Sequence, residues 1–381
     1  MKHLSVWIMA GAMLAACQSN DNADSIMTID LNKKYQEKEI ILQDIMDVEY
    51  VPLDSSDEFV SSGNIKAVGD KYIVLVSGGK ILLFDRHTGK GIRVIDHEGQ
   101  GADEYTLAYN VILDEANNEL FVNDPTIKKI CVYDLEGNFK RSFSHGEEHQ
   151  FIDVTDFDKD FLVCYDEAIF MDMVKTETDN SKTYHFLISK QDGSIAQEIS
   201  VPYEKINAPM LQVGGMTSVT FVRAVVPLNK DMLIIQNSSD TIYRYTANKH
   251  QMVPFLVKIP STDPERLITI GTVTPQYCFF QTIDKTFNPE TGRGFPHHDL
   301  VIDRQTNEVF SSVVLNADYS SKQQVDMIRF AQNGEVLCVQ ALQAHKLVEA
   351  NEKGELNGYL KEIASQLNED SNSVIMVMRA K

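Results

Sequence analysis

The stretch KICVYDLEGNFKRSF, residues 129–143, has the pattern of two strands joined by a tight turn. Apolar residues run through its first half, and a polar segment around Gly137 separates them from the second half, as in a β-hairpin. Glycine supplies the positive φ that such a turn requires. The stretch therefore predicts a hairpin, and its recurrence along the chain would indicate a repeat protein.

Turns of this kind occur six times in the 381 residues, centred on Gly89, Gly137, Gly193, Asn248, Asn307 and Gly354. Successive centres lie 48, 56, 55, 59 and 47 residues apart. A period of roughly 40 to 60 residues is typical of β-propeller blades. A second strand pair with its own polar turn precedes each hairpin, as in ANNELFVN at 116–123 and NKDMLIIQ at 229–236. Each unit is therefore expected to hold four strands.

Six units of four strands predict an all-β protein, a six-bladed β-propeller formed by residues 28–381 as one domain. Single blades cannot bury both faces, so they must pack as one ring. Strand-like segments outside the six units, EIILQDI and VEYVPL near the start and SVIMVMR at 373–379, are expected to close the ring in the last blade. One short helix is predicted at 356–368, where apolar residues have helical spacing.

The first 27 residues lie outside this pattern. Residues 1–16 have a positively charged start and a short apolar core, which predict a signal peptide. The order Leu14, Ala15, Ala16, Cys17 resembles the bacterial lipobox, which implies a lipid-modified Cys17 as the mature N-terminus. Polar, acidic residues 17–27 suit a flexible tether and resemble the export signals of Bacteroidetes surface lipoproteins. We expect an outer-membrane lipoprotein, on the periplasmic face or the cell surface, with the membrane as a partner through the lipid.

The formal net charge of −20 makes nucleic acid an unfavourable partner, because phosphate binding needs a cationic face. Four cysteines remain after the signal peptide, namely Cys131, Cys164, Cys278 and Cys338, each in a strand-like apolar run. Their spacing matches no zinc pattern, and they are predicted to be small buried residues, although a disulfide stays open. No cofactor is predicted.

The segment DHEGQGADEYTLAYNVILDEANNELFVNDPTIKKICVYDLEGNFKRSF, residues 96–143, resembles an NHL-type propeller repeat. The chain after the tether resembles the six-bladed β-propeller lipoproteins of Bacteroidetes, most clearly over residues 64–143. This resemblance implies architecture and no particular activity. It makes DHEGQGADEY the connector between two blades, in which Gly99 and Gly101 turn the backbone and Tyr105 packs between the blades.

Several short motifs have two interpretations, and the structural one is favoured for each. DFDKDFLVCYDE, 156–167, has acids at calcium-loop positions, but Phe161 replaces the required glycine, so we predict a turn and a strand with calcium as the alternative. HGEEH at 145–149 and HHD at 297–299 are predicted to be solvated loops rather than zinc sites. SGGK at 77–80 is predicted to be a hairpin.

Polar residues on the inner strands would line the central channel and are the candidate ligand-binding residues: Asn64, Lys66, Asn110, Asp153, Arg223, Asp326 and Arg329. A long insertion, DKTFNPETGRGFPHHD at 284–299, contributes Arg293 and His297 as candidates on a recognition loop.

Three functions stay open. A non-catalytic module could bind a glycan, a peptide or an envelope protein; this is favoured because no catalytic motif is present, although the lone Trp7, within the signal peptide, argues against a glycan. A lyase or hydrolase could assemble its site in the funnel from separate blades, with Asp153, Arg223 and His297 as first candidates. The third function is an accessory subunit of an outer-membrane nutrient-uptake complex.

Overall fold

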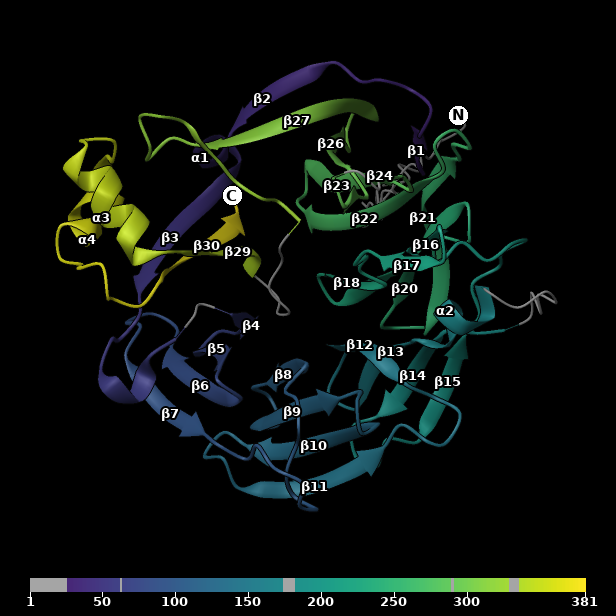
Figure 1. Ribbon diagram of the computed structural model, residues 1–381, viewed down its shortest axis with the longest axis horizontal. Helices are drawn as coiled ribbons and strands as arrows, with labels where there is room; N and C mark the ends of the chain where they lie inside the picture. The colour runs from purple at the N-terminus through teal and green to yellow at the C-terminus, as the bar shows by residue number, and fades with distance from the viewer. Residues whose placement is uncertain (1–25, 62–63, 174–181, 289–290, 329–335) are drawn as a thin grey trace, which may run out of the picture.

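The computed structural model describes residues 26–61, 64–173, 182–288, 291–328 and 336–381. Six sheets form a ring around a central channel (Figure 1), so the predicted six-bladed β-propeller is confirmed. The innermost described strand of each blade contacts that of the next, and the last contacts the first. Blades need this arrangement because each sheet is apolar on both faces.

The first three blades are four-stranded antiparallel sheets. Blade 1 holds β4 (Ile65–Val68), β5 (Tyr72–Ser77), β6 (Lys80–Asp85) and β7 (Gly91–Ile95). Blade 2 holds β8 (Asn110–Asp114), β9 (Glu119–Asp124), β10 (Lys129–Asp134) and β11 (Phe139–Ser144). Blade 3 holds β12 (Phe151–Asp156), β13 (Phe161–Asp166), β14 (His185–Ser189) and β15 (Ile195–Ile199), with helix α2 (Ala168–Met173) after β13.

Blades 4 and 5 each gain a parallel strand from the N-terminal segment on their outer edge. Blade 4 holds β18 (Val225–Leu228), β19 (Asp231–Ile234), β20 (Thr241–Thr246) and β21 (Gln251–Ile259), and β1 (Met27–Asp30) pairs with β21. Blade 5 holds β22 (Arg266–Val273), β23 (Tyr277–Asp284), β26 (His297–Asp303) and β27 (Glu308–Asn316), and β2 (Glu37–Ile41) pairs with β27. These additions cover edges that would otherwise be open.

VEYVPL and SVIMVMR meet in blade 6, as predicted. β30 (Val374–Ala380) lies between β29 (Val336–Leu342) and β3 (Met46–Pro52) and pairs with both. The placement of EIILQDI in the last blade is wrong, because this segment forms part of β2, which pairs with β27 of blade 5. Before β29, the carbonyl of Met327 accepts from the Thr272 amide of blade 5 at 2.8 Å. β3 and the last strand, β30, thus close the ring in one sheet.

Five of the six predicted turns join the outer strands of a blade. Gly89, Gly137, Gly193 and Asn307 have positive φ, while in blade 4 the positive φ falls on His250 rather than Asn248. The sixth prediction is wrong, because Gly354 lies between α3 (Ala344–Glu352) and α4 (Gly358–Ala364). The helix expected at 356–368 is present as α4, and α3, which was not predicted, precedes it in a helical pair inserted between β29 and β30. The remaining short elements are α1 (Leu42–Ile45), a 3₁₀ turn at Asp57–Phe59 and β28 (Gln323–Gln324).

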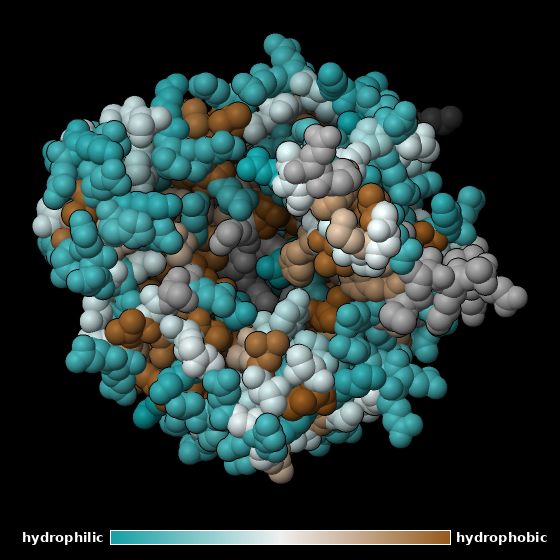
Figure 2. Space-filling model, in the orientation of Figure 1, coloured by the Kyte–Doolittle hydropathy of each residue, from teal (hydrophilic) through white to brown (hydrophobic). Residues whose placement is uncertain are grey.

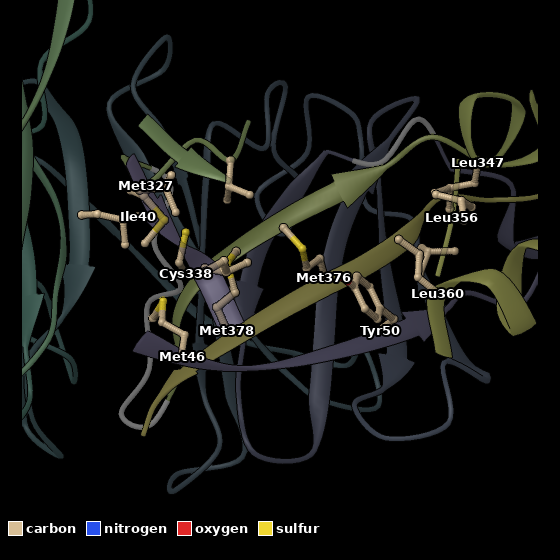
Figure 3. Close-up of a cluster of buried hydrophobic side chains, with 14 of the residues drawn as sticks. Ile40, Met46, Tyr50, Met327, Cys338, Leu347, Leu356, Leu360, Met376 and Met378 are labelled. Carbon is tan, nitrogen blue, oxygen red and sulfur yellow. The ribbon is translucent and has the colours of Figure 1, made fainter. Parts of the chain in front are cut away.

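The helical pair shares a core with the closing blade (Figure 3). Leu347 of α3 and Leu360 of α4 belong to the same buried cluster as Tyr50, Met376 and Cys338 of the blade 6 strands. The hydroxyl of Tyr50 donates to Asp318 at 2.7 Å. All four described cysteines are buried thiols, as predicted, and none forms a disulfide with another described residue.

In the connector between blades 1 and 2, residues 96–109, several polar groups form hydrogen bonds with other groups of the protein. The Lys129 ammonium donates to the carbonyls of Gly101, Ala102 and Glu104 at 2.8 to 3.3 Å. Tyr105 is fully buried between the blades, as predicted, and its hydroxyl donates to the carbonyl of Gly79 at 2.8 Å.

Gly99 and Gly101 lie in a bend of the backbone, as expected, but neither has a positive φ. A Cβ at Gly99 would overlap the Glu104 carboxylate, which accepts the Gly101 amide at 2.7 Å. Close approach of a side chain, rather than an unusual backbone angle, requires glycine at position 99.

Candidate functional site

A mainly apolar hollow with several polar groups lies between the inner strands of blades 2, 3 and 4, and we call it the channel cleft. Its volume is about 720 Å³. Figure 2 shows a hollow at the centre of the ring, with hydrophobic surface beside it on the side where Figure 1 places β16, β17 and β18. The lining residues are Tyr109, Ile152, Asp153, Tyr165, Glu167, Phe170, Asn207, Pro209, Met210, Gln212, Thr217, Val219, Thr220, Phe221, Val222, Arg223, Ala224, Ile235 and Asn237.

One wall comes from the long connector between blades 3 and 4, residues 200–224. It folds into a hairpin of β16 (Met210–Val213) and β17 (Met216–Val219). Side chains alternate between the faces of a strand, so the cross-strand pairs Met210 with Val219 and Gln212 with Thr217 share one face. All four residues line the channel cleft.

The other face of the hairpin rests on blade 5. Leu211 packs against the buried cluster of Leu267, Ile283 and Phe295. Phe295 follows a second hairpin, β24 (Phe287–Asn288) with β25 (Arg293–Gly294). The blade 5 insertion therefore supports the wall of the channel cleft from behind.

A buried carboxylate faces the channel cleft from β12. Asp153 is only 4% exposed, and its Oδ2 accepts the Ala224 amide at 3.3 Å at the start of β18. Burial raises the pKa of the Asp153 carboxyl, and the Arg223 guanidinium and the amides of Ala224 and Val225 oppose that shift. Asp153 thus fixes blade 4 against blade 3 and also presents an acidic group to the channel cleft.

Two cationic groups lie on the channel side, of which Arg223 lines the hollow and Lys66 does not. Arg223 lines it and stacks its guanidinium 5.5 Å from the Phe221 ring centre, a cation–π geometry. Lys66 of β4 reaches from blade 1 and donates its Nζ to the Tyr109 carbonyl at 2.9 Å. Burial and the charge of Arg223 both lower the pKa of Lys66, so the two cations lie within electrostatic range across the channel.

The phenol of Tyr109 lies among these charges. Burial raises its pKa, as do the carboxylates of Asp153 and Glu167, while Arg223 lowers it. Glu167 also lines the channel cleft. The hollow therefore combines apolar walls with both cationic and acidic groups near its channel side.

Comparison with known families decides what this chain is related to. Residues 26–379 match the model of the domain of unknown function DUF4934. The chain belongs to the DUF4934 family. No curated protein matches it in sequence.

Two solved structures share the fold of this DUF4934 protein. A Bacteroides fragilis protein described as exported is 14% identical, with 94% of this chain and all of that chain covered and a TM-score of 0.59. A member of the DUF4221 family from Bacteroides vulgatus is 10% identical, with 88% and 97% covered and a TM-score of 0.51. At these identities the likeness concerns architecture alone.

Of the channel candidates, Asp153 and Arg223 line the channel cleft, whereas Lys66, Asn64, Asn110 and Asp326 do not. Asn110 accepts from the Asn123 side chain at 2.9 Å within blade 2. Asn64 is exposed, and its carbonyl accepts the Val76 amide. Asp326 accepts the Ile328 amide at 2.9 Å through its side chain.

Two further candidates, Arg329 and the lipidation residue Cys17, lie outside the described residues.

The insertion that carries Arg293 and His297 is a hairpin and a strand rather than a free loop. Both side chains are exposed, and neither lines the channel cleft. Asp153, Arg223 and His297 therefore do not form one constellation. Recognition by the insertion stays a prediction, whereas its contribution through Phe295 is to support the hairpin.

The histidine motifs are also placed differently from the solvated loops that we predicted. His145 of HGEEH is buried; its Nε2 contacts Asn123 Oδ1 at 2.7 Å and its Nδ1 accepts the Phe151 amide at 3.1 Å. HHD at 297–299 begins strand β26, because His297 and His298 pair with β23. SGGK forms the predicted hairpin, and Phe161–Asp166 is a strand as predicted.

Within the described ranges, no group of three or more histidine, cysteine or acidic residues is arranged to hold a metal ion. Among the helices of the described residues, none is long and apolar enough to cross a membrane.

Sequence reasoning missed the apolar and amide residues of connector 200–224. The available signal was Gly214-Gly215 between two short alternating stretches, which is a hairpin pattern in the longest fully described connector between blades.

Proposed function

We propose that this DUF4934 protein is an exported, lipid-anchored β-propeller that binds a small amphipathic organic molecule in the channel cleft. The observation that carries the proposal is the combination of a hollow of about 720 Å³ and a mainly apolar lining that also holds charged, amide and hydroxyl groups. Ligand sites are typically concave, mainly apolar and of roughly 300 to 1,000 Å³.

Exposed apolar side chains around the hollow support this proposal. Met216, Val219 and Phe221 are 57%, 63% and 59% exposed on or beside the hairpin. Exposed apolar surface of this kind is costly in water unless a ligand or partner covers it part of the time. A rigid ring supports the surface, since each wall belongs to a blade or packs on one.

The export part of the proposal rests on the sequence. The lipobox-like order ending at Cys17 supports lipid attachment, and the Bacteroides fragilis structure with the same fold is described as exported. Replacement of Cys17 by Ser is expected to release the protein from the membrane fraction into the soluble one. Equal membrane association of both forms would refute the lipid anchor.

The binding site is tested with N-phenyl-1-naphthylamine, a neutral apolar dye that fluoresces in apolar surroundings. Titration of the mature protein should raise the fluorescence to saturation. V219D should weaken binding about tenfold or more, because it places a charge on the wall. V253D is the matched control, since Val253 is a similarly exposed strand residue on the outer part of blade 4. The proposed site fails if the dye does not bind, or if both variants weaken binding equally.

A further inference from the structure

One amide among the residues that line the channel cleft is held by a buried ammonium group. Asn207 lies in the connector between blades 3 and 4 and lines the hollow. Its Oδ1 accepts from the Nζ of Lys285 at 2.7 Å. Lys285 follows β23 of blade 5, and its side chain is only 3% exposed. A charged group from blade 5 thus fixes a residue of the channel cleft.

This contact determines the orientation of the Asn207 amide. An ammonium group can only donate, so it must meet the amide oxygen and not the amide nitrogen. The Nδ2 group forms no hydrogen bond with another described residue, and it is not among the buried atoms without a partner. Its two N–H donors are therefore accessible, in a residue that lines the hollow.

The backbone of Asn207 is held as well as its side chain. Its amide donates to the Ser238 hydroxyl of blade 4 at 2.8 Å. Lys285 in turn forms an ion pair with Glu265 of blade 5 at 3.1 Å. Because two blades fix this residue, little conformational freedom would be lost when a ligand binds to it.

The other amide side chains of the channel cleft do not offer a fixed donor. Asn237 also lines the hollow, but its Nδ2 donates to the Ile268 carbonyl at 3.1 Å and its Oδ1 accepts the Ile268 amide at 2.8 Å. Both of its polar groups thus join blade 4 to blade 5. Gln212 is exposed on the hairpin, and no hydrogen bond to a described residue orients it. Of these three amides, Asn207 is the one that is both oriented and available.

Apolar surface adjoins this donor. Pro209 and Met210 follow Asn207 closely in the chain, line the same hollow and are both buried. We infer that the ligand carries a carbonyl oxygen, which accepts a hydrogen bond from Asn207 Nδ2, and an apolar body that lies against Pro209 and Met210. Lys285 is a positioning residue, because it holds the amide with its donors toward the ligand. This inference rests on the proposed function and adds the chemical class of the ligand.

The test compares two probes that differ only at the acceptor: 4-phenyl-2-butanone and 2-methyl-4-phenyl-1-butene, in which a CH₂ group replaces the carbonyl oxygen. Each displaces N-phenyl-1-naphthylamine from the mature protein. The ratio of the two dissociation constants is compared between the wild type and a variant, so that the different hydration of the probes cancels. N207L should weaken binding of the ketone relative to the alkene about fivefold or more, because the carbonyl loses its donor.

A second variant separates donation from structure. N207D retains an oxygen that accepts from Lys285 but has no N–H donor, so it should weaken ketone binding relative to the alkene as N207L does. N248L is the matched control, because Asn248 is exposed on the outer turn of blade 4 and does not line the channel cleft. A wild-type ratio in both N207L and N207D overturns the inference, provided that circular dichroism and the denaturation midpoints match the wild type.

The role of Lys285 has its own readout. K285M frees the amide to rotate, so the ketone should lose about twofold to fivefold in affinity relative to the alkene, while the alkene binds within about twofold of its wild-type affinity. A merely structural role would weaken both probes equally. K249M, at an exposed lysine of the outer turn of blade 4, should leave both affinities unchanged. A wild-type ratio in K285M overturns the positioning role.

The wild-type protein provides a measurement that needs no variant. The ketone is labelled with ¹³C at its carbonyl and bound to an excess of the mature protein. Its carbonyl NMR signal should lie downfield of the position in hexane, because a hydrogen bond to the oxygen withdraws electron density from the carbon. A signal at the hexane position overturns the inference.

The two proposals fail in different ways. If the neutral dye does not bind the wild-type protein, the channel cleft is no ligand site and the proposed function fails. If the dye binds but the ketone does not displace it, or the ratio is the same in the wild type, N207L and N207D, only the inference about the carbonyl fails.

Discussion

The connector between blades 1 and 2 and the connector between blades 3 and 4 have opposite relations between sequence and role. DHEGQGADEY, at the start of residues 96–109, is rich in groups that bind metals or phosphate, yet several of its polar atoms bond to groups of the same chain. Residues 200–224 carry few charges, and they form a wall of the channel cleft.

The difference follows from how each connector meets its neighbours. Tyr105 and the ammonium of Lys129 hold the first connector against two blades, so this connector is packed along its contacts with them. The second folds into a hairpin with one face on blade 5 and the other toward a hollow. The number of polar or charged residues in a loop is therefore a weaker sign of a binding site than the presence of an exposed face that the rest of the fold holds in place.

The largest expected effect is on the stability of the first connector. Y105A should lower the free energy of unfolding by about 3 to 5 kcal/mol, because it empties a fully buried aromatic position and loses the bond to Gly79. Urea denaturation followed by circular dichroism measures it. V219S in the second connector should change stability by less than about 0.5 kcal/mol. Similar losses in the two variants would break the comparison.

A third connector, residues 145–150, is expected to give a pH effect. His145 Nδ1 accepts the Phe151 amide, so Nε2 carries the proton and donates to Asn123. Burial lowers the pKa of His145 from 6.5 to about 4. Between these two pH values the unfolded chain binds a proton at His145 and the folded protein does not. The free energy of unfolding therefore falls by up to about 3 kcal/mol as the pH drops from 6.5 to 4.

The measurement is the difference in unfolding free energy between the wild type and H145Q across that pH range. This difference isolates the histidine, because the raised pKa of Asp156, about 6, acts with the opposite sign in the same window. A difference for H145Q that does not change between pH 6.5 and 4 would contradict the buried neutral histidine.

A smaller effect is expected at Gly99. G99A should cost about 1 kcal/mol, because the new methyl group displaces the Glu104 carboxylate and breaks its bond with the Gly101 amide. In the E104A background the same change should cost clearly less, and a double-mutant cycle measures that coupling. Additive costs would show that the carboxylate is not the constraint.

The smallest effect is expected in the hairpin turn of the second connector. Gly215 has a φ of +80°, and nothing lies within 4 Å of a Cβ built there. Asn tolerates this backbone region, so G215N should change the unfolding free energy by less than about 0.5 kcal/mol. G99N, with the same new side chain in the first connector, should cost more. If G215N cost more than G99N, the interpretation that lack of space constrains Gly99 and backbone angle alone constrains Gly215 would be refuted.

The fold was predictable because the repeat is visible in short local sequence patterns. Turn residues with positive φ and apolar strands recur at blade spacing, so the blades could be counted without any tertiary information. The one misplaced turn has a physical cause. Gly354 has the same left-handed φ as a hairpin glycine, since a residue that ends a helix uses that conformation too.

The candidate site was predictable only in part. Inner-strand position selected Asp153, and also Arg223 two residues before β18, but it selected Lys66 as well, which does not line the channel cleft. His145 could not be placed, because its partners Asn123 and Phe151 belong to two different blades. The wall formed by Met210 and Val219 depends on how the hairpin rests on blade 5, which no local pattern encodes.

The closing sheet of blade 6 makes the order of synthesis matter. Val48 is among the first folded residues to emerge from the ribosome, and its neighbour in the sheet is Met378, near the end of the chain. Among the described residues, β3 and β29 both pair with β30, so this three-stranded arrangement cannot form before β30 is made. Such distant pairings slow folding. A growing chain can assemble its early blades, but β3 must wait for β30 before it joins the closing sheet.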